Sequence, residues 1–355
     1  MKDETKSLIM THSQLRDFIN RAPAELNVLV HGAPGLGKSA AIEQAADDLG
    51  MNFCSIRAAE MERADIAGCL VPQTDKTGKM RSVYALSSLL PTAENTLVFI
   101  DEILNCAPDL QGSLFELLQE RRLAASGYIL PANCRIIGAG NDAEDSICSQ
   151  DLAAPMANRF VHIWLEADVD SWSSWALSHG ISPTVVGFVN FRPALLHKVS
   201  DVEPAWPSPR SWEMVSKLEA AGLAEYAAGA VGTGAGTEYL AFARNAQAIG
   251  DIAKMVKTGV FIIPKRDDQQ VAYATALVVH AFKKDVENSG EKFLAGIKEL
   301  PADMRNLAVR LVMNLPLAER TARLMEIRKA KAFPEFAKAF SLVMKGVDKE
   351  FKLDL

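Results

Sequence analysis

Short apolar runs alternate with amphipathic segments through the first part of the chain. Compact apolar runs predict four strands, at residues 27–31, 52–57, 96–100 and 134–139. Apolar residues at helical spacing predict helices at residues 38–49 and 110–122, whereas the polar, turn-rich residues 71–80 predict a loop. Strands that alternate with helices predict a parallel sheet covered on both faces.

The pattern becomes helical after about residue 166. Three helices are predicted, at residues 171–178, 184–190 and 210–221, with a proline-rich joint at residues 203–209. Helical periodicity then continues from residue 238 to residue 355, and the glycine-rich residues 229–236 fit either a linker or a helix junction. We therefore expect an α/β domain at residues 1–166, followed by helical regions at residues 167–236 and 237–355.

A glycine-rich segment, GAPGLGKS, directly follows the first predicted strand. It fits the phosphate-loop pattern G-x-x-x-x-G-K-[ST] and lies between a strand and a helix, as that pattern requires. In such a loop backbone amides surround phosphate oxygens, Lys38 reaches the β- and γ-phosphates, and the Ser39 hydroxyl ligates Mg²⁺. The predicted ATP-binding residues are Gly32, Ala33, Pro34, Gly35, Leu36, Gly37, Lys38, Ser39 and Ala40.

Two acids, Asp101 and Glu102, end the strand at residues 96–100. An acidic strand end is common by itself. After a phosphate loop, however, the pair predicts that Asp101 helps to hold Mg²⁺ and that Glu102 is the base that polarises the attacking water. A kinase or a nucleotide sensor would not need the adjacent glutamate, so the pair favours hydrolysis.

Three further polar residues are candidates for catalysis. Asn141 follows the strand at residues 134–139 and could orient the water near the γ-phosphate, although it also fits a plain strand-ending turn. Arg159 lies in an Asn-Arg-Phe triplet, and Arg210 begins a predicted helix. Guanidinium groups stabilise charge on a transferring phosphoryl group, in the same subunit or from a neighbour; either arginine could instead be solvated or paired with a carboxylate.

The order of these motifs resembles that of the AAA+ ATPases over roughly residues 10–220, and most of all the MoxR branch with its CbbQ/NorQ-type proteins. The resemblance implies a P-loop NTPase parallel sheet as the AAA+ core, an α-helical lid at residues 167–236 and an additional C-terminal helical region. It also implies a role for each motif residue: Walker A for Lys38 and Ser39, Walker B for Asp101 and Glu102, sensor 1 for Asn141, an arginine finger toward the next subunit for Arg159, and sensor 2 for Arg210.

The same resemblance implies two hairpin-like insertions whose loops face a central pore, the helix-2 insert at residues 74–82 and the pre-sensor-1 hairpin at residues 124–133. It leaves open whether Arg121 or Arg122 also faces a neighbouring subunit. Ordinary surface turns are the alternative for both loops. Two features depart from the family: Cys106 and Pro108 stand where a more polar run is usual, and the helical region after residue 238 has no clear counterpart.

The overall composition narrows the possible partners. With 38 Lys+Arg against 44 Asp+Glu, the net charge of −6 argues against a duplex-DNA binder, although it does not exclude a basic lining inside a ring. The five cysteines form no CxxC pair, which disfavours a zinc site or a disulfide framework. No signal peptide and no apolar run that could span a bilayer is visible, so we expect a cytoplasmic protein.

The sequence therefore predicts an ATPase that uses Mg²⁺ and converts ATP to ADP and phosphate. By resemblance it forms a homo-oligomeric ring, a hexamer, and remodels or activates a protein client, often one with a von Willebrand factor A domain. A motor or translocase stimulated by nucleic acid is one alternative, which the acidic balance disfavours. A nucleotide-gated scaffold with negligible turnover is another, which Glu102 disfavours.

Overall fold

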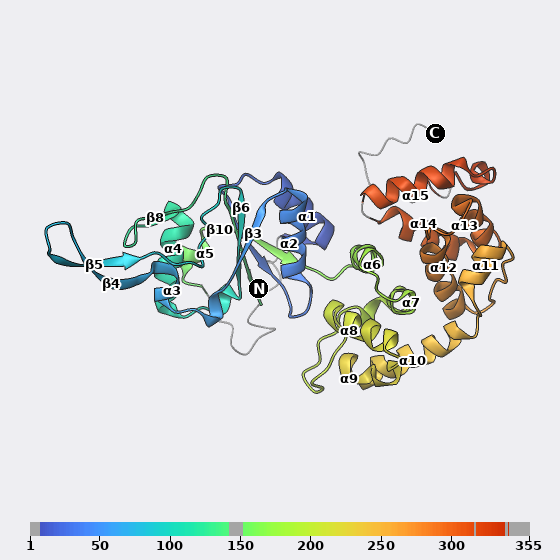
Figure 1. Cartoon of the computed structure of the whole chain (residues 1–355). Coiled ribbons are helices and arrows are strands. Elements are labelled where there is room, and N and C mark those ends of the chain that lie inside the picture. Colours follow the sequence, from blue (N-terminus) through green and yellow to red (C-terminus); the bar gives the residue numbers. More distant parts are fainter. Residues whose placement is uncertain (1–7, 142–151, 316, 338–339, 341–355) are drawn as a thin grey trace. The chain divides into compact units, whose positions relative to one another are not determined.

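The chain divides into two compact units, Met1–Glu166 and Ala167–Leu355. The computed structural model describes residues 8–141, 152–315, 317–337 and 340. The first unit is a sheet with helices on both faces, and the second is helical (Figure 1). Asp142 and Cys148 lie outside the described residues.

The first unit is built on a six-stranded sheet with the order β1-β10-β2-β9-β6-β3, in which every neighbouring pair is parallel. All residues of the central strand β2 are buried, as expected where helices cover both faces. The predicted parallel sheet is confirmed. Its strands are β1 (Ile9–Met10), β2 (Asn27–His31), β3 (Asn52–Arg57), β6 (Thr96–Asp101), β9 (Arg135–Gly140) and β10 (Phe160–Leu165).

Strand β10 was not predicted. Its sequence, FVHIWL, has the apolar residues of a buried strand, but His162 interrupts the run. In the sheet, the Nε2 atom of His31 lies 2.8 Å from Nδ1 of His162, and the ring of His31 stacks on Trp164. These contacts hold the end of β2, and with it the start of the phosphate loop, against the neighbouring strand.

Helices cover both faces of this sheet. In Figure 1, α1 and α2 lie on one face, and α3 and α4 lie on the other. Helix α4 buries Leu110, Leu114, Leu117 and Leu118 in the core that also contains Leu29 of β2, because this leucine spacing places them on one side of the helix. The bounds are α1 (His12–Arg21), α2 (Lys38–Asp48), α3 (Arg63–Ala67), α4 (Pro108–Glu120) and α5 (Ala154–Ala157).

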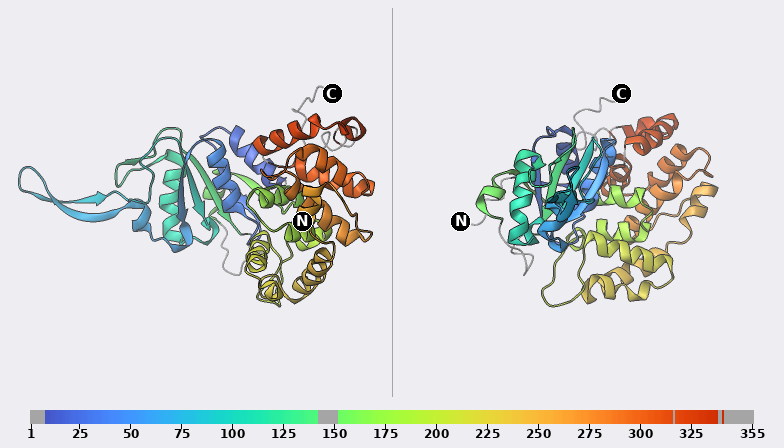
Figure 2. Two further views of the ribbon diagram at one scale, coloured as in Figure 1. Left: turned by 45° about the vertical axis from the view of Figure 1, so that its right-hand side comes forward. Right: turned by 60° about the vertical axis from the view of Figure 1, so that its left-hand side comes forward.

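Two antiparallel hairpins extend from the first unit: β4 (Cys69–Thr74) with β5 (Met80–Ala85), and β7 (Arg122–Leu123) with β8 (Tyr128–Ile129). The prediction of a loop at residues 71–80 was therefore wrong for residues 71–74 and 80, which pair in the long β4–β5 hairpin. The hairpin-like insertion expected at residues 74–82 lies within this hairpin. Its turn is closed by Asp75, whose carboxylate accepts hydrogen bonds from the Thr77 and Lys79 amides. Figures 1 and 2 show this hairpin projecting from the sheet.

The second unit consists of helices packed around two hydrophobic clusters. One cluster gathers Trp172, Phe188, Trp212 and Phe242, and the other gathers Leu277, Phe293 and Leu311. Helix α12 contributes to both, through Ala272 and Leu277 respectively. The bounds are α6 (Val169–Ser178), α7 (Pro183–Phe191), α8 (Pro209–Ala220), α9 (Ala228–Val231), α10 (Thr233–Gln247), α11 (Ile252–Thr258), α12 (Asp267–Ala281), α13 (Ser289–Ile297), α14 (Ala302–Met313) and α15 (Leu317–Lys329).

The glycine-rich segment at residues 229–236 is a helix junction. Gly232, at φ +80°, turns the chain between α9 and α10, a backbone conformation that favours glycine. The division after residue 236 into a lid and an extension stays a prediction, although α10 runs across that position.

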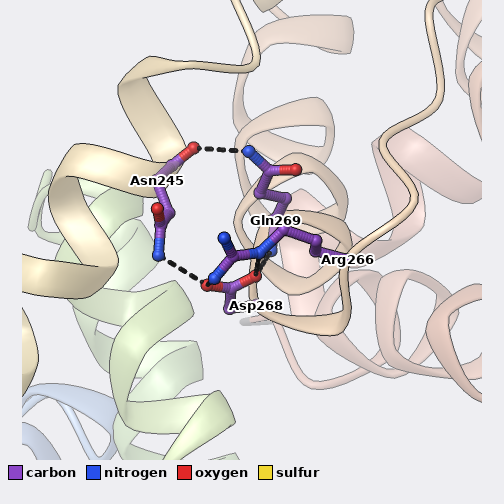
Figure 3. A network of polar contacts seen from close by, with 4 residues as sticks. All are labelled: Asn245, Arg266, Asp268 and Gln269. Carbon is purple, nitrogen blue, oxygen red and sulfur yellow. Dashed lines mark hydrogen bonds and ion pairs between the residues drawn. The ribbon is translucent and has the colours of Figure 1, made fainter.

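A polar network joins α10 to the start of α12 (Figure 3). The Asp268 carboxylate accepts hydrogen bonds from Asn245 Nδ2 at 2.8 Å and from Arg266 Nη2 at 2.9 Å. Gln269 Nε2 donates to the Asn245 carbonyl oxygen at 3.1 Å. The end of α10 is thereby fixed to α12 by side chains as well as by apolar packing.

The described residues also bear on disulfides, metal sites and membrane-spanning helices. The described cysteines, Cys54, Cys69, Cys106 and Cys134, are free thiols. Within the described ranges, His, Cys, Asp and Glu side chains nowhere gather in threes that could hold a metal. No described helix combines the length and the apolar character needed to cross a membrane.

Candidate active site

The loop between β2 and α2 has the backbone shape that a phosphate loop needs. Gly35 and Gly37 have φ values of +78° and +87°, which residues with a side chain adopt only at a cost. Gly37 is the N-cap of α2 and supplies no side-chain cap. The first amides of α2 therefore keep their donor capacity for an anion at the positive end of the helix.

Lys38 lies at the centre of this loop. Its side chain is buried, and its ammonium donates to Gly32 O at 2.6 Å, to Ala33 O at 3.1 Å and to Asn141 Oδ1 at 2.7 Å. The loop thus wraps around a positive charge. The contact with Asn141 joins the end of β9 to the phosphate loop, so two predicted site residues from distant parts of the sequence lie together.

The end of β6 approaches the same loop. Ser39 Oγ donates a hydrogen bond to Asp101 Oδ2 at 3.2 Å. Strand β9 lies between β2 and β6, so all three carboxyl ends meet at one edge of the sheet. A hydroxyl and a carboxylate oxygen at this separation suit Mg²⁺, which takes few protein ligands and keeps several waters.

Glu102 has an unusual backbone conformation. Its φ and ψ values of 55° and 32° are left-handed, which costs a residue with a side chain about 1–3 kcal/mol. Its amide donates to Asp101 Oδ1 at 2.9 Å, and the buried residues Ile103 and Leu104 anchor the turn that follows. Leu104 packs against Gly140 of β9, where a β-carbon would clash with it at 2.4 Å. The surrounding packing thus maintains a strained backbone conformation at Glu102, directly after Asp101.

Arg57 is a charged residue at this edge that the sequence analysis missed. It ends β3, directly opposite Asp101 in the strand register. Its hydrogen bond with Glu60 raises the pKa of the Arg57 guanidinium, and the charges of Asp101 and Glu102 add to this effect. The available signal was its position as the last residue of a predicted strand, since the carboxyl ends of parallel strands meet at one edge.

Arg159 lies at the amino-terminal end of the strands, opposite the end that carries the phosphate loop. It precedes β10, whose first residue, Phe160, pairs with Asn27 at the start of β2. Strand β2 is 5 residues long, which at about 3.3 Å per residue separates this end from the phosphate loop by roughly 15 Å. The guanidinium lies over the Phe115 ring, and its Nε donates to Gln119 Oε1 at 3.1 Å. Arg159 is therefore not brought to Lys38 within the chain.

The other arginines differ in their contacts. Arg121 is tied to its own unit, because it donates to Glu25 O at 2.7 Å and to Asn27 Oδ1 at 3.0 Å. Arg122 pairs with Glu120 at the surface. Arg210 is the second residue of α8 in the second unit, where its side chain is exposed. Its predicted role in the lid stays a prediction.

Comparison with known proteins supports this description of the first unit. Residues 27–160 match the model of the AAA domain of the dynein-related subfamily. The first unit thus contains an AAA domain with the P-loop NTPase fold of AAA+ ATPases, and a substantial helical region follows it in the chain.

Two solved structures have distant similarity to this chain. The RuvB Holliday junction branch migration motor of Thermotoga maritima is 14% identical, with 88% of this chain and 83% of that chain covered and a TM-score of 0.34. NtrX from Brucella abortus is 13% identical, with 94% and 68% covered and a TM-score of 0.33. Similarities this distant assign no function to the chain.

Proposed function

We propose that this chain is an AAA+ ATPase that binds ATP with Mg²⁺ and hydrolyses it to ADP and phosphate. The observation that carries the proposal is the convergence of Lys38, Ser39, Asp101 and Asn141 at one sheet edge, through contacts of 2.7 Å and 3.2 Å. These residues lie at or shortly after the carboxyl ends of three strands, β2, β6 and β9, and are separated widely in the sequence. Their meeting beside a glycine-rich loop is the arrangement that phosphoryl chemistry requires.

Each residue has a role that its position supports. Residues 32–40 hold the phosphates through backbone amides, and Lys38 exchanges its loop carbonyl partners for phosphate oxygens. Ser39 and Asp101 hold Mg²⁺, in part through water, and the ion neutralises charge on the phosphates. Glu102 accepts the proton of the attacking water, and Asn141 orients that water.

The active form in this proposal is a homo-oligomeric ring, a hexamer, in which Arg159 completes the site of the next subunit. Arg159 lies at the opposite end of the strands from Lys38, and this position supports a role between subunits. Arg210 in the lid is the proposed sensor 2. The proposed setting is the cytoplasm.

The work of the ring in this proposal is remodelling or activation of a protein client, as in the MoxR branch, with a von Willebrand factor A-domain protein as the candidate partner. The β4–β5 hairpin supports contact with a protein, because Leu70 and Met80 are 60% and 75% exposed on it. Turnover should rise when the client is added. Stimulation by DNA or RNA alone would instead indicate a nucleic-acid motor.

The hydrolysis step is tested by Glu102→Gln. Glutamine keeps the shape of glutamate but cannot accept the proton, so turnover should fall by roughly 100-fold or more while Mg–ATP binding is retained. Phosphate release and nucleotide affinity are measured on the same preparation. Glu94→Gln is the matched control, because this exposed glutamate precedes the same strand at its far end and should leave turnover unchanged. Normal hydrolysis by Glu102→Gln would show that the base is another group.

A further inference from the structure

The side chain of His12 contacts the turn at the end of the phosphate loop. Its Nε2 atom lies 2.6 Å from the carbonyl oxygen of Leu36. A carbonyl oxygen only accepts hydrogen bonds, so Nε2 carries a proton and donates it. A β-carbon built on Gly37 would lie 3.5 Å from the same nitrogen, so the imidazole also packs against Gly37.

This hydrogen bond determines the direction of one backbone amide. Leu36 and Gly37 share a peptide unit, which is planar and trans. In such a unit the C=O and N–H groups point in opposite directions. While His12 holds the Leu36 carbonyl, the Gly37 amide points away from the imidazole. That amide lies at the start of α2 beside Lys38, among the donors that a phosphate loop offers to its ligand.

His12 is itself held in place. It is the first residue of α1, whose N-terminus is closed by reciprocal hydrogen bonds between Thr11 and Gln14. Helix α1 is tied to α2 by the ion pair between Arg16 and Asp48, at 2.6 Å. The imidazole therefore sits on a helix that is attached to the helix carrying the phosphate loop.

We infer that His12 is a positioning residue of the phosphate loop: its hydrogen bond to the Leu36 carbonyl keeps the Gly37 amide directed at the phosphates of the bound nucleotide. The inference rests on the proposed function, since it concerns the affinity of the same site. His12 acts through the backbone, so its effect falls on nucleotide binding and not on the proton transfer from the attacking water to Glu102.

Two variants separate this role from plain packing. His12→Ala removes the donor, and His12→Gln keeps an N–H group near the position of Nε2. In His12→Ala the Kd for Mg–ADP and the KM for ATP should rise by about 5- to 20-fold, the effect of one hydrogen bond, while kcat at saturating ATP stays within about twofold. His12→Gln should recover most of the affinity. His179→Ala, which changes an exposed histidine of the second unit, is the control and should bind as wild type.

Wild-type affinity in His12→Ala would overturn the inference, as would equal weakening in His12→Ala and His12→Gln. If His12→Ala fails to fold, His12→Gln decides, because only the donor role predicts near-normal binding there. A wild-type protein that binds no Mg–ADP would refute the proposed function instead. The two failures are therefore distinguishable in one set of titrations.

Discussion

Lys38 is the residue on which the site is centred. In the structure its ammonium is surrounded by two loop carbonyls and the amide oxygen of Asn141. A lysine ammonium has three donor hydrogens, which match these three acceptors. A triphosphate would replace neutral acceptors by charged ones, and hydrogen bonds between charged groups are the stronger. Phosphate oxygens of the ligand would thus replace the carbonyl and amide oxygens that Lys38 contacts in the structure.

Arg159 gives a prediction at the residue scale. Arg159→Ala should lower turnover by roughly 100-fold or more with little change in nucleotide affinity, because in our proposal the guanidinium stabilises charge in the site of a neighbour. Arg21→Ala, at an exposed residue paired with Asp17, is the control and should be unaffected. Loss of nucleotide binding in Arg159→Ala would show that the residue has another role.

Mixing two inactive variants tests whether Arg159 acts on the site of a neighbouring subunit. Equal amounts of Arg159→Ala and Lys38→Ala subunits, each inactive alone, should assemble rings in which about one quarter of the sites combine an intact Lys38 with a neighbour's intact Arg159. Phosphate release by the mixture should therefore exceed that of either variant. A mixture without activity would argue that Arg159 acts within its own subunit.

Some site residues could be predicted from the sequence and others could not. The phosphate loop and the acid pair are contiguous patterns whose chemistry requires those residues in that order, so Lys38 and Asp101 could be predicted directly as candidates. The His12 contact was not foreseeable, because its partner is a backbone carbonyl 24 residues away. Arg57 was missed for a related reason, since its place beside Asp101 depends on which strands pair.

At the scale of elements, helical positions were predicted more reliably than strand pairing. Helices α6, α7 and α8 begin and end within two residues of the predicted bounds, since caps and prolines mark them. The length of the β4–β5 hairpin was underestimated, because its strands are mostly exposed and lack the alternating burial of a half-buried strand. Pairing in such a hairpin depends on its turn, which Asp75 closes.

The packing of α9 against α10 gives a prediction at the element scale. A β-carbon at the buried Gly236 would meet Ala228 Cα at 2.5 Å, whereas one at Gly234 in the same helix would meet nothing within 4 Å. Gly236→Ala should lower the free energy of unfolding by about 1–3 kcal/mol through overpacking. Gly234→Ala should leave it unchanged or raise it by up to about 1 kcal/mol. Denaturant titration checks both, and equal stabilities would contradict this account of the junction.

At the scale of the whole molecule, the chain combines an AAA domain with a helical unit of comparable length. The residues that bind and cleave the nucleotide in our proposal lie in the first unit, while Arg210 belongs to the second. In the proposed ring, Arg159 of one subunit reaches the nucleotide of the next, so assembly and turnover should depend on each other. Sequence patterns say least about the protein client, because a client is recognised through exposed surfaces and not through a fixed motif.

The most direct test is calorimetric titration of Mg–ADP into the folded full chain at two temperatures, beside Lys38→Ala. The account predicts saturable binding of about one nucleotide per chain, with a Kd in roughly the micromolar range, and weakening by about tenfold or more in the variant. Absence of binding to folded wild-type protein, or equal binding by Lys38→Ala, would contradict the claim that this loop encloses a nucleotide.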